Sequence, residues 1–252
     1  MPPDLDFVRV DARILSSYSD KPLSGFEEAG FAPRDVADAL LALCLELPWL
    51  RVTELRRTVA TQARARAKYE RWLAAKAAGE PFDSKTMKRD FVAKPGKSMH
   101  NAGRAVDLWT EPMRQALGAE YLDVFWPVAA RHGFTPVLAK PTEGRSEEWH
   151  FDHAGPWGNV RAHHGYEAMA LCAALIAGEA GEWQSDARLA QALLLRQGLD
   201  IGEPDGAIGK RTRAALLRTG VYPGANPSTL AVIEAIPALR ALPPATTWER
   251  VG

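Results

Sequence analysis

The stretch Ser98-Met99-His100-Asn101-Ala102-Gly103-Arg104-Ala105-Val106-Asp107 carries a histidine and an aspartate with a glycine between them. Forty residues after this aspartate, Glu147-Glu148-Trp149-His150 supplies a second histidine and two further carboxylates. A catalytic zinc site needs this set, because three protein side chains hold the ion, a fourth position stays open for water, and a separate carboxylate moves protons. The two segments therefore predict a metal-dependent hydrolase.

The separation of His100 and Asp107 predicts a bend in the chain between them. The two residues are seven positions apart, so a straight strand would direct their side chains to opposite faces. Gly103 is the residue that permits a turn or a bulge. We therefore expect His100 on a loop and Asp107 on the strand that follows, so that both side chains reach one ion.

The same reasoning does not identify which glutamate transfers protons. In a plain strand Glu148 and His150 share a face, whereas Glu147 points to the same side as Trp149. A bend before Trp149 would instead bring Glu147 round towards the ion. Alternation alone does not choose between Glu147 and Glu148.

Composition indicates an ordinary globular protein. Of the 252 residues, 46% are hydrophobic and 25% are charged, and the formal net charge is zero, so nothing points to nucleic acid or an anionic membrane as partner. A surplus of arginine at residues 51–66 can still form a positively charged surface on one face.

The first residues lack the pattern of a signal peptide and no apolar run is long enough for a membrane span, so we expect synthesis in the cytoplasm. Cys44 and Cys172 are expected to be buried thiols.

Apolar periodicity predicts an α+β fold with a small, mostly antiparallel sheet flanked by helices, plus a small all-α C-terminal module. Helices are expected over residues 34–47, 59–78, 115–131, 165–181, 186–197, 210–218 and 227–236. Strands are expected over residues 49–53, 104–109, 134–139 and 148–152. We expect a catalytic domain at 1–165, a helical linker at 166–184, the helical module at 185–240 and a tail at 241–252.

The two metal-site segments resemble the signature of the zinc D-alanyl-D-alanine carboxypeptidase and dipeptidase family, whose fold also occurs in hedgehog signalling domains. The resemblance covers about residues 30–155. It implies that His100, Asp107 and His150 ligate Zn²⁺ and that the glutamate of Glu-x-Trp-His, here Glu147, is the general base and acid. In that role Glu147 takes a proton from the attacking water and delivers one to the leaving amine.

Members of this family also carry an arginine in a Gly-Tyr-Arg-Ser stretch, followed five residues later by glutamine. Here Arg57-Thr58 and Gln62 keep that spacing, while Leu55-Arg56 replaces Gly-Tyr. The resemblance therefore implies that Arg57 orients the substrate or polarises its carbonyl, with Arg56 as a rival. The alternative interpretation of this arginine run is a solvated helix face.

Other residues near the two segments have expected positions. Ser98 is expected to hydrogen-bond the substrate or to hold the loop that carries His100, and Trp149 is expected to contact the substrate. His153 is expected beside the metal ligands. The remaining histidines are expected at the surface or at helix ends: His132, His163 and His164.

The C-terminal region resembles the three-helix peptidoglycan-binding module often fused to cell-wall hydrolases. The resemblance is carried by Leu189–Leu194, Gly198, Asp205-Gly206, Gly209 and Arg211–Leu216. The chain departs from the pattern where Leu217-Arg218-Thr219 replaces the usual Phe-Gln ending. The alternative is a helical bundle that only packs on the catalytic domain.

Together the two resemblances imply a zinc peptidase that cuts the stem peptide of bacterial peptidoglycan at a D-Ala-D-Ala type bond, as a D,D-carboxypeptidase. One alternative is an endolysin-type endopeptidase that cuts L-Ala-D-Glu or a cross-bridge, and another is a non-catalytic wall-binding protein with structural zinc. We expect a monomer with peptidoglycan as its partner. It would reach the wall by phage-type release or, alternatively, act on wall fragments in the cytoplasm.

Overall fold

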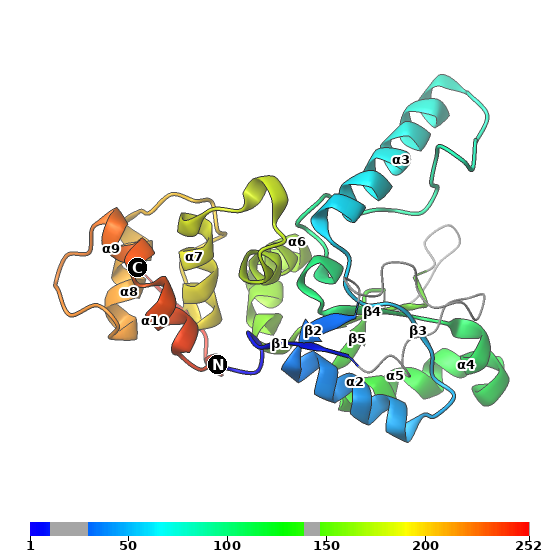
Figure 1. Ribbon diagram of the computed structural model, residues 1–252, viewed down its shortest axis with the longest axis horizontal. Coiled ribbons are helices and arrows are strands. Elements are labelled where there is room, and N and C mark those ends of the chain that lie inside the picture. Colours follow the sequence, from blue (N-terminus) through cyan, green and yellow to red (C-terminus); the bar gives the residue numbers. More distant parts are fainter. Residues whose placement is uncertain (11–29, 139–146, 252) are drawn as a thin grey trace.

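A four-stranded antiparallel sheet forms the centre of the N-terminal part of the protein (Figure 1). The computed structural model describes residues 1–10, 30–138 and 147–251. In order across the sheet, the strands are β3 (Val52–Glu54), β4 (Ala105–Leu108), β6 (His150–His153) and β5 (Phe134–Pro136). A separate antiparallel ribbon pairs β1 (Phe7–Arg9) with β2 (Phe31–Pro33). The predicted α+β class with a small, mostly antiparallel sheet is confirmed.

The two faces of this sheet differ because side chains alternate along each strand. Val106 of β4 and Phe151 of β6 point into an apolar layer and are fully buried. Asp107, His150 and Asp152 occupy the alternate positions and so share the opposite, polar face. Asp107 and His150 are also direct partners in the β4–β6 register, which places their side chains next to each other.

Helices cover the apolar face of the sheet. They are α2 (Arg34–Glu46), α4 (Thr110–Leu117) and α5 (Tyr121–Arg131). Phe125 of α5 meets Phe151 edge-on with ring centroids 5.1 Å apart, and Leu40 of α2 belongs to the same buried cluster. This layer buries the apolar face of the sheet and leaves the polar face to carry the site.

On the other side, α6 (Gly158–Ala177) joins the sheet region to the C-terminal helices (Figure 1). It packs on the 3₁₀ turn η1 (Met99–Ala102) and on α7 (Asp186–Arg196). One apolar cluster runs from Met99 through α6 into α7. A buried ion pair between Asp4 and Arg196 adds a second connection, with Nε to Oδ2 at 2.5 Å.

The C-terminal helices form a compact bundle around α7. They are α8 (Lys210–Thr219), α9 (Thr229–Glu234) and α10 (Ile236–Ala241). A short parallel pair, β7 (Leu199–Asp200) with β8 (Glu249–Arg250), ties the last residues to this bundle. Two further 3₁₀ turns are η2 (Gly155–Trp157) and η3 (Gly181–Trp183).

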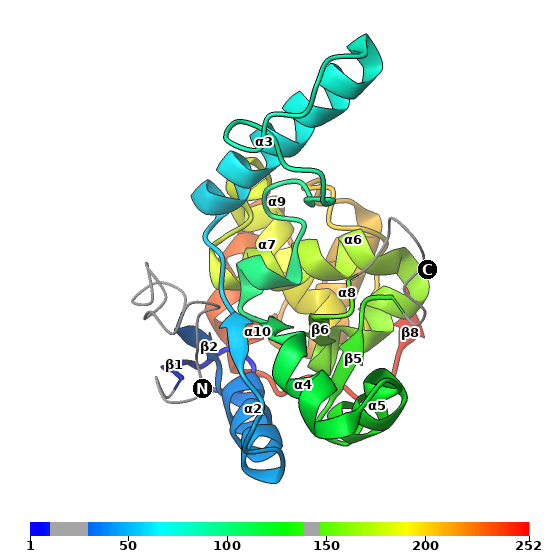
Figure 2. The ribbon, with the colours of Figure 1, turned by 90° about the vertical axis from the view of Figure 1, so that its right-hand side faces the viewer.

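Helix α3 (Val59–Ala78) has the predicted bounds and projects away from the rest of the protein (Figures 1 and 2). The Thr58 hydroxyl caps its first turn by accepting from the Thr61 amide at 3.3 Å, and Gly79 ends it with φ +70°. Within residues 1–10, 30–138 and 147–251, no helix combines the length and the apolar character that a membrane span requires.

Several predicted elements differ from the structure for local reasons. The helix expected over 115–131 is two helices, because Gly118 at φ +80° ends α4. The helix expected over 227–236 is also two, α9 and α10, which meet at Ala235. Helix α6 begins seven residues earlier than expected, and Gly165 at φ +83° interrupts it. The strand expected over 134–139 ends at Pro136; residue 139 lies outside the described residues.

Both cysteines are free thiols. Cys172 is buried in α6 as predicted, whereas Cys44 on α2 is only half-buried. Burial raises the pKa of the Cys44 thiol to about 11, so it is not a reactive thiolate at neutral pH.

Candidate metal centre

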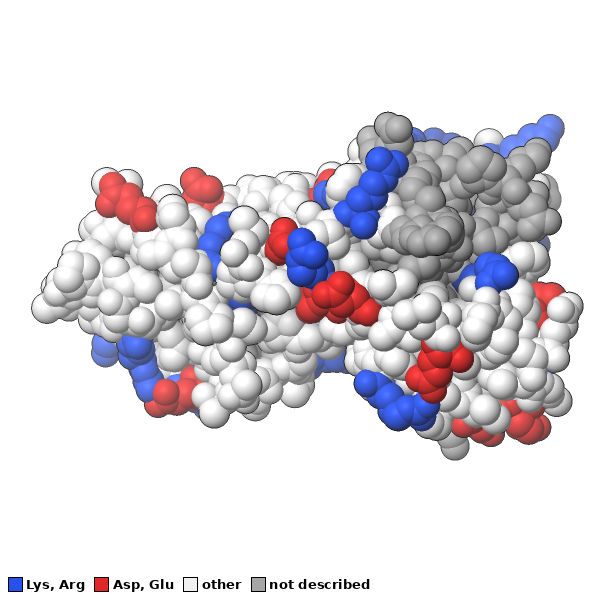
Figure 3. Space-filling view, turned by 60° about the horizontal axis from the view of Figure 1, so that its bottom comes forward, with Lys and Arg blue, Asp and Glu red and all other residues white. Residues whose placement is uncertain are grey.

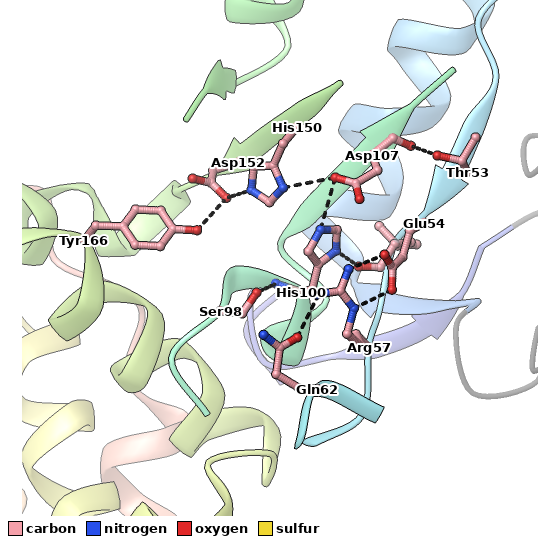
Figure 4. Close-up of polar contacts among 11 residues, drawn as sticks. Thr53, Glu54, Arg57, Gln62, Ser98, His100, Asp107, His150, Asp152 and Tyr166 are labelled. Atoms are coloured by element: carbon pink, nitrogen blue, oxygen red, sulfur yellow. Dashed lines mark hydrogen bonds and ion pairs between the residues drawn. The ribbon is translucent and has the colours of Figure 1, made fainter. Parts of the chain in front are cut away.

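His100, Asp107 and His150 converge on the polar face of the sheet (Figure 4). One potential ligand atom of each lies within 4.8 Å of the others. His100 Nε2 lies 3.2 Å and His150 Nδ1 lies 3.0 Å from the same atom, Oδ1 of Asp107. The His100 and His150 side chains are nearly inaccessible to solvent.

The bend that the spacing of His100 and Asp107 demands is present at Gly103. The Ser98 hydroxyl accepts from the His100 amide at 3.3 Å and starts the 3₁₀ turn that carries this histidine. Gly103 ends the turn at φ +63°, and a Cβ there would lie 3.0 Å from the Phe31 carbonyl oxygen. His100 therefore lies on the turn and Asp107 on the strand that follows it.

Each histidine is oriented by a second contact on its other ring nitrogen. His100 Nδ1 lies 2.8 Å from the Leu55 carbonyl oxygen, which can only accept a hydrogen bond, so this nitrogen is the donor. His150 Nε2 lies 3.1 Å from Oδ1 of Asp152. These contacts leave His100 Nε2 and His150 Nδ1 to face Asp107, which is the arrangement that metal-binding histidines generally show.

Asp152 is fully buried and connects the site to α6. Its Oδ1 also accepts from the Tyr166 hydroxyl at 3.4 Å, whereas its Oδ2 has no hydrogen-bond partner among the described residues. Figure 4 shows the resulting chain of contacts from Tyr166 through Asp152 and His150 to Asp107.

The electrostatics of the cluster favour a cation between these side chains. Burial by itself would raise the pKa of Asp107, but the charges and hydrogen bonds of His100 and His150 hold it well below its usual range. Burial alone would lower the pKa of His150, yet its hydrogen bonds to Asp107 and Asp152 raise it to about 10. Two imidazoles and one half-buried carboxylate are a donor set that fits a transition-metal ion, so this cluster can hold one.

The two glutamates before Trp149 have different surroundings. Glu148 forms an ion pair with Arg114 of α4. Glu147 is half-buried, its pKa is raised by burial, and the charges of His150 and Asp107 act on its carboxyl group. None of the described residues donates a hydrogen bond to the Glu147 carboxylate. Glu148 is therefore paired with a residue of α4, whereas Glu147 lies beside the cluster formed by His100, Asp107 and His150.

A turn before β6 accounts for this difference. The His150 amide donates to the Glu147 carbonyl at 3.1 Å, so the chain turns at 147–150 and the strand begins only at His150. The predicted strand start at 148 is thus wrong, whereas the bend expected before Trp149 is present. Trp149 is half-buried in this turn, and its carbonyl accepts from the Leu108 amide at 2.8 Å.

Arg57 lies next to the candidate metal ligands and is held in place by two side chains. Both oxygens of Glu54 accept from its guanidinium, and Gln62 Oε1 accepts from Nη1 at 2.8 Å. The Arg57 amide donates to the His100 carbonyl at 3.0 Å. Arg56, the rival, points elsewhere and pairs with Glu179 at 3.1 Å.

The remaining predicted residues have these positions. Ser98 is buried and holds the turn that carries His100. The expected position of His153 beside the metal ligands is wrong, because alternation along β6 directs it to the face opposite His150. There it contacts the Phe134 ring and the guanidinium of Arg104.

Three residues of the site were not predicted. Asp152 could have been found, because it follows His150 by two positions and so shares its face of β6. Glu54 lies three residues before Arg57, although nothing in the sequence distinguishes this pairing from a surface contact. No feature of the sequence indicates that Tyr166 belongs to the site, because it reaches Asp152 only through the packing of α6.

No protein-family model matches this chain, and no curated protein matches it. Among solved structures, the chain is similar to the LdcB LD-carboxypeptidase, a structure described as revealing the molecular basis of peptidoglycan recognition. The two share 19% sequence identity over 58% of this chain and 67% of that chain, with a TM-score of 0.40. A likeness this weak carries no functional weight, and the function depends on the side chains described above.

Proposed function

We propose that the protein is a zinc-dependent peptidase that hydrolyses the stem peptide of bacterial peptidoglycan at a D-Ala-D-Ala type bond. The observation that carries this proposal is the convergence of His100, Asp107 and His150 with Glu147 beside them. The family signature in the two segments supports the choice of substrate. Peptidoglycan is accordingly the proposed partner.

Zinc suits the donor set better than harder cations do. Two imidazole nitrogens and one carboxylate oxygen are a common set of three protein ligands in catalytic zinc sites, whereas magnesium and calcium prefer oxygen ligands. When bound, a zinc ion supplies Lewis acidity that makes water acidic and polarises a carbonyl group. Asp152 and the Leu55 carbonyl hold the two imidazoles in the required orientation.

Glu147 is the proposed general base and acid. Burial raises the pKa of its carboxyl group, which brings it closer to the range in which a group both accepts and donates a proton near neutral pH. Its carboxylate takes the proton of the attacking water and then delivers a proton to the leaving amine. Glu148 is the less suitable candidate, because it forms an ion pair with Arg114 of α4.

Arg57 is proposed to orient the substrate. Its contacts to Glu54 and Gln62 use three of the five N–H donors of a guanidinium, so two donors remain for a substrate carbonyl or carboxylate. Because these contacts fix the plane of the guanidinium, little side-chain entropy is lost when a substrate binds. Ser98 and Trp149 stay proposed substrate contacts.

The C-terminal helices have two proposed roles. Their shared apolar cluster with α6 supports packing on the catalytic part. Wall binding through α7, α8 and the segment between them stays a prediction from the sequence resemblance, as do the monomeric state and action at the cell wall.

The experiment that tests this function combines metal analysis with product identification. Purified protein is expected to hold close to one zinc per chain, and to release D-alanine from purified sacculi or soluble stem peptides. A chelator should abolish the activity and added zinc should restore it. Mass spectrometry of the products distinguishes this cut from one at L-Ala-D-Glu or a cross-bridge. Bound zinc without any product would contradict the peptidase and favour a structural metal.

A further inference from the structure

The segment from Val59 to Lys97, here called the arm, stands apart from the rest of the protein. It consists of α3 and the chain that returns along it, and it projects away from the sheet and the C-terminal helices (Figures 1 and 2). Nearly all of its side chains are exposed or half-buried. Folding of a hydrophobic core therefore does not explain its composition.

Positive charge is concentrated in the arm. It holds ten lysines and arginines against four acidic residues, an excess of six, although the whole chain has a formal net charge of zero. The rest of the chain consequently carries the opposite excess. On the face shown in Figure 3, by contrast, acidic and basic side chains lie beside one another. An arm with this excess of positive charge attracts polyanions.

Both ends of the arm are fastened to the metal centre. Gln62, which holds Arg57, also donates to the Ala93 carbonyl at 2.8 Å and so joins the outgoing and returning chains. Asn101, next to His100, donates to the Arg57 carbonyl at 2.8 Å and accepts from the Gly96 amide at 3.1 Å. A polymer bound along the arm would therefore lie next to the metal cluster.

The outer half of the arm presents aromatic rings together with cations. Arg89 lies over the Phe82 ring at 4.2 Å and Lys76 over the Trp72 ring at 5.3 Å. These side chains line an open hollow together with Gly79 and Glu80. Because the rings already hold the two cations in place, a ligand need not order them on binding.

We propose that the arm binds the peptidoglycan polymer and holds it beside the metal centre. This inference rests on the proposed function, because the substrate of the site decides which polyanion is offered to the arm. Stem peptides carry free carboxylates at regular intervals, which complement a row of exposed lysines and arginines. Binding along the arm raises the local concentration of scissile bonds at the site without contributing to the reaction itself.

A charge-reversal variant of the arm tests the proposal. Arg71 and Lys85 are exposed and form no ion pair among the described residues, so R71E/K85E removes arm charge with little effect on the fold. R34E/R131E changes two exposed arginines outside the arm, which pair with Asp6 and Glu46, and is the control for charge reversal away from the arm. Thermal melting confirms that both are folded.

Sedimentation with purified sacculi at increasing salt measures binding. We expect binding of the unaltered protein to weaken with salt and R71E/K85E to bind about tenfold more weakly, with a smaller loss in the control. The ratio of D-alanine release from sacculi to release from a soluble stem pentapeptide should fall by a similar factor in R71E/K85E alone.

The outcomes separate the two proposals. Equal binding and equal rate ratios in R71E/K85E and R34E/R131E would overturn the role of the arm while leaving the peptidase in place. Absence of hydrolysis on either substrate, with arm-dependent binding to sacculi, would instead contradict the peptidase and support the arm. Arm-dependent binding to vesicles of anionic lipid as tight as to sacculi would overturn the assignment to peptidoglycan.

Discussion

Asp152 lies two residues beyond His150 on the same face of β6, and its Oδ1 accepts from Nε2 of that histidine at 3.1 Å. The aspartate is fully buried, and its second contact is the Tyr166 hydroxyl of α6. A candidate metal ligand is thus oriented by its own strand, while the orienting group is held by a helix that also packs on the C-terminal bundle. The ligand geometry and the packing of α6 are therefore physically connected.

The replacement Asp152→Asn should weaken zinc binding. The shape of the side chain is kept but its charge is lost, so His150 becomes a less basic and less firmly oriented ligand. Loss of such an outer contact typically lowers metal affinity by about 10- to 100-fold. Competition against a chromogenic chelator measures the change, with the exposed Asp38→Asn as control. Unaltered affinity in a folded D152N protein would contradict the orienting role.

The replacement Glu147→Gln should retain zinc and lose turnover. Removing a general base or acid typically lowers the rate by about 10²- to 10⁴-fold, while the three ligands are untouched. Glu148→Gln is the matched control, because it changes the neighbouring glutamate that pairs with Arg114. Rates of D-alanine release and the zinc content of each variant should be measured together. Higher activity in E147Q than in E148Q would exchange the two assignments.

The replacement Arg57→Lys should impair the reaction more than Arg56→Lys. A lysine keeps the charge but cannot form the paired contact to Glu54 and still reach Gln62 and the substrate. If Arg57 contacts the scissile carbonyl, we expect a loss of about 10²-fold or more in kcat/KM. Steady-state kinetics on a soluble stem peptide measures it. Equal effects of the two replacements would remove the basis for preferring Arg57.

Zinc binding should release a proton at neutral pH. The pKa of His150 is raised to about 10 in the metal-free protein, so the imidazole is protonated at pH 7 and must lose its proton to bind a metal. Affinity should therefore rise about tenfold per pH unit up to that pKa. Calorimetry in buffers of different ionisation enthalpy counts the protons released. No release at pH 7 would show that His150 is already neutral.

The raised pKa of His150 also makes the stability of the metal-free protein depend on pH. Because the folded-state pKa of His150 lies above its ordinary value of 6.5, its contribution is complete below that value. The contribution is lost as the pH rises from there through about 10. Denaturant melts of chelator-treated protein between pH 6 and pH 10 should show this decline, which bound zinc should suppress.

The replacement Gly103→Ala should destabilise the turn that positions His100. An added Cβ would require an unfavourable φ of +63° and would press on the Phe31 carbonyl at 3.0 Å. Gly79→Ala is the matched control, since Gly79 has φ +70° with nothing within 4 Å of the added atom. We expect about 1 kcal/mol for the backbone cost in both, and more in G103A. Equal melting temperatures would show that the close approach to Phe31 is relieved without cost.

The sequence by itself determined the local parts of the candidate metal centre. The odd spacing of His100 and Asp107 required a bend, and Gly103 was the residue able to supply it. The bend expected before Trp149, as the condition for Glu147 to turn towards the ion, is likewise a local feature and is present at 147–150. The bounds of α3 were predicted to the residue, since Thr58 and Gly79 are strong local signals. These features depend on backbone stereochemistry over a few residues, which the sequence encodes directly.

Only the tertiary structure decided how distant segments combine. Arg114 of α4 holds Glu148 and leaves Glu147 beside the cluster. Asp152 obtains its second contact from Tyr166 only because α6 packs against the turn that carries His100. The arm has its place at the site because Asn101 and Gln62 join its ends to Arg57. Such contacts depend on how helices pack around a shared core, and periodicity within one segment carries no information about them.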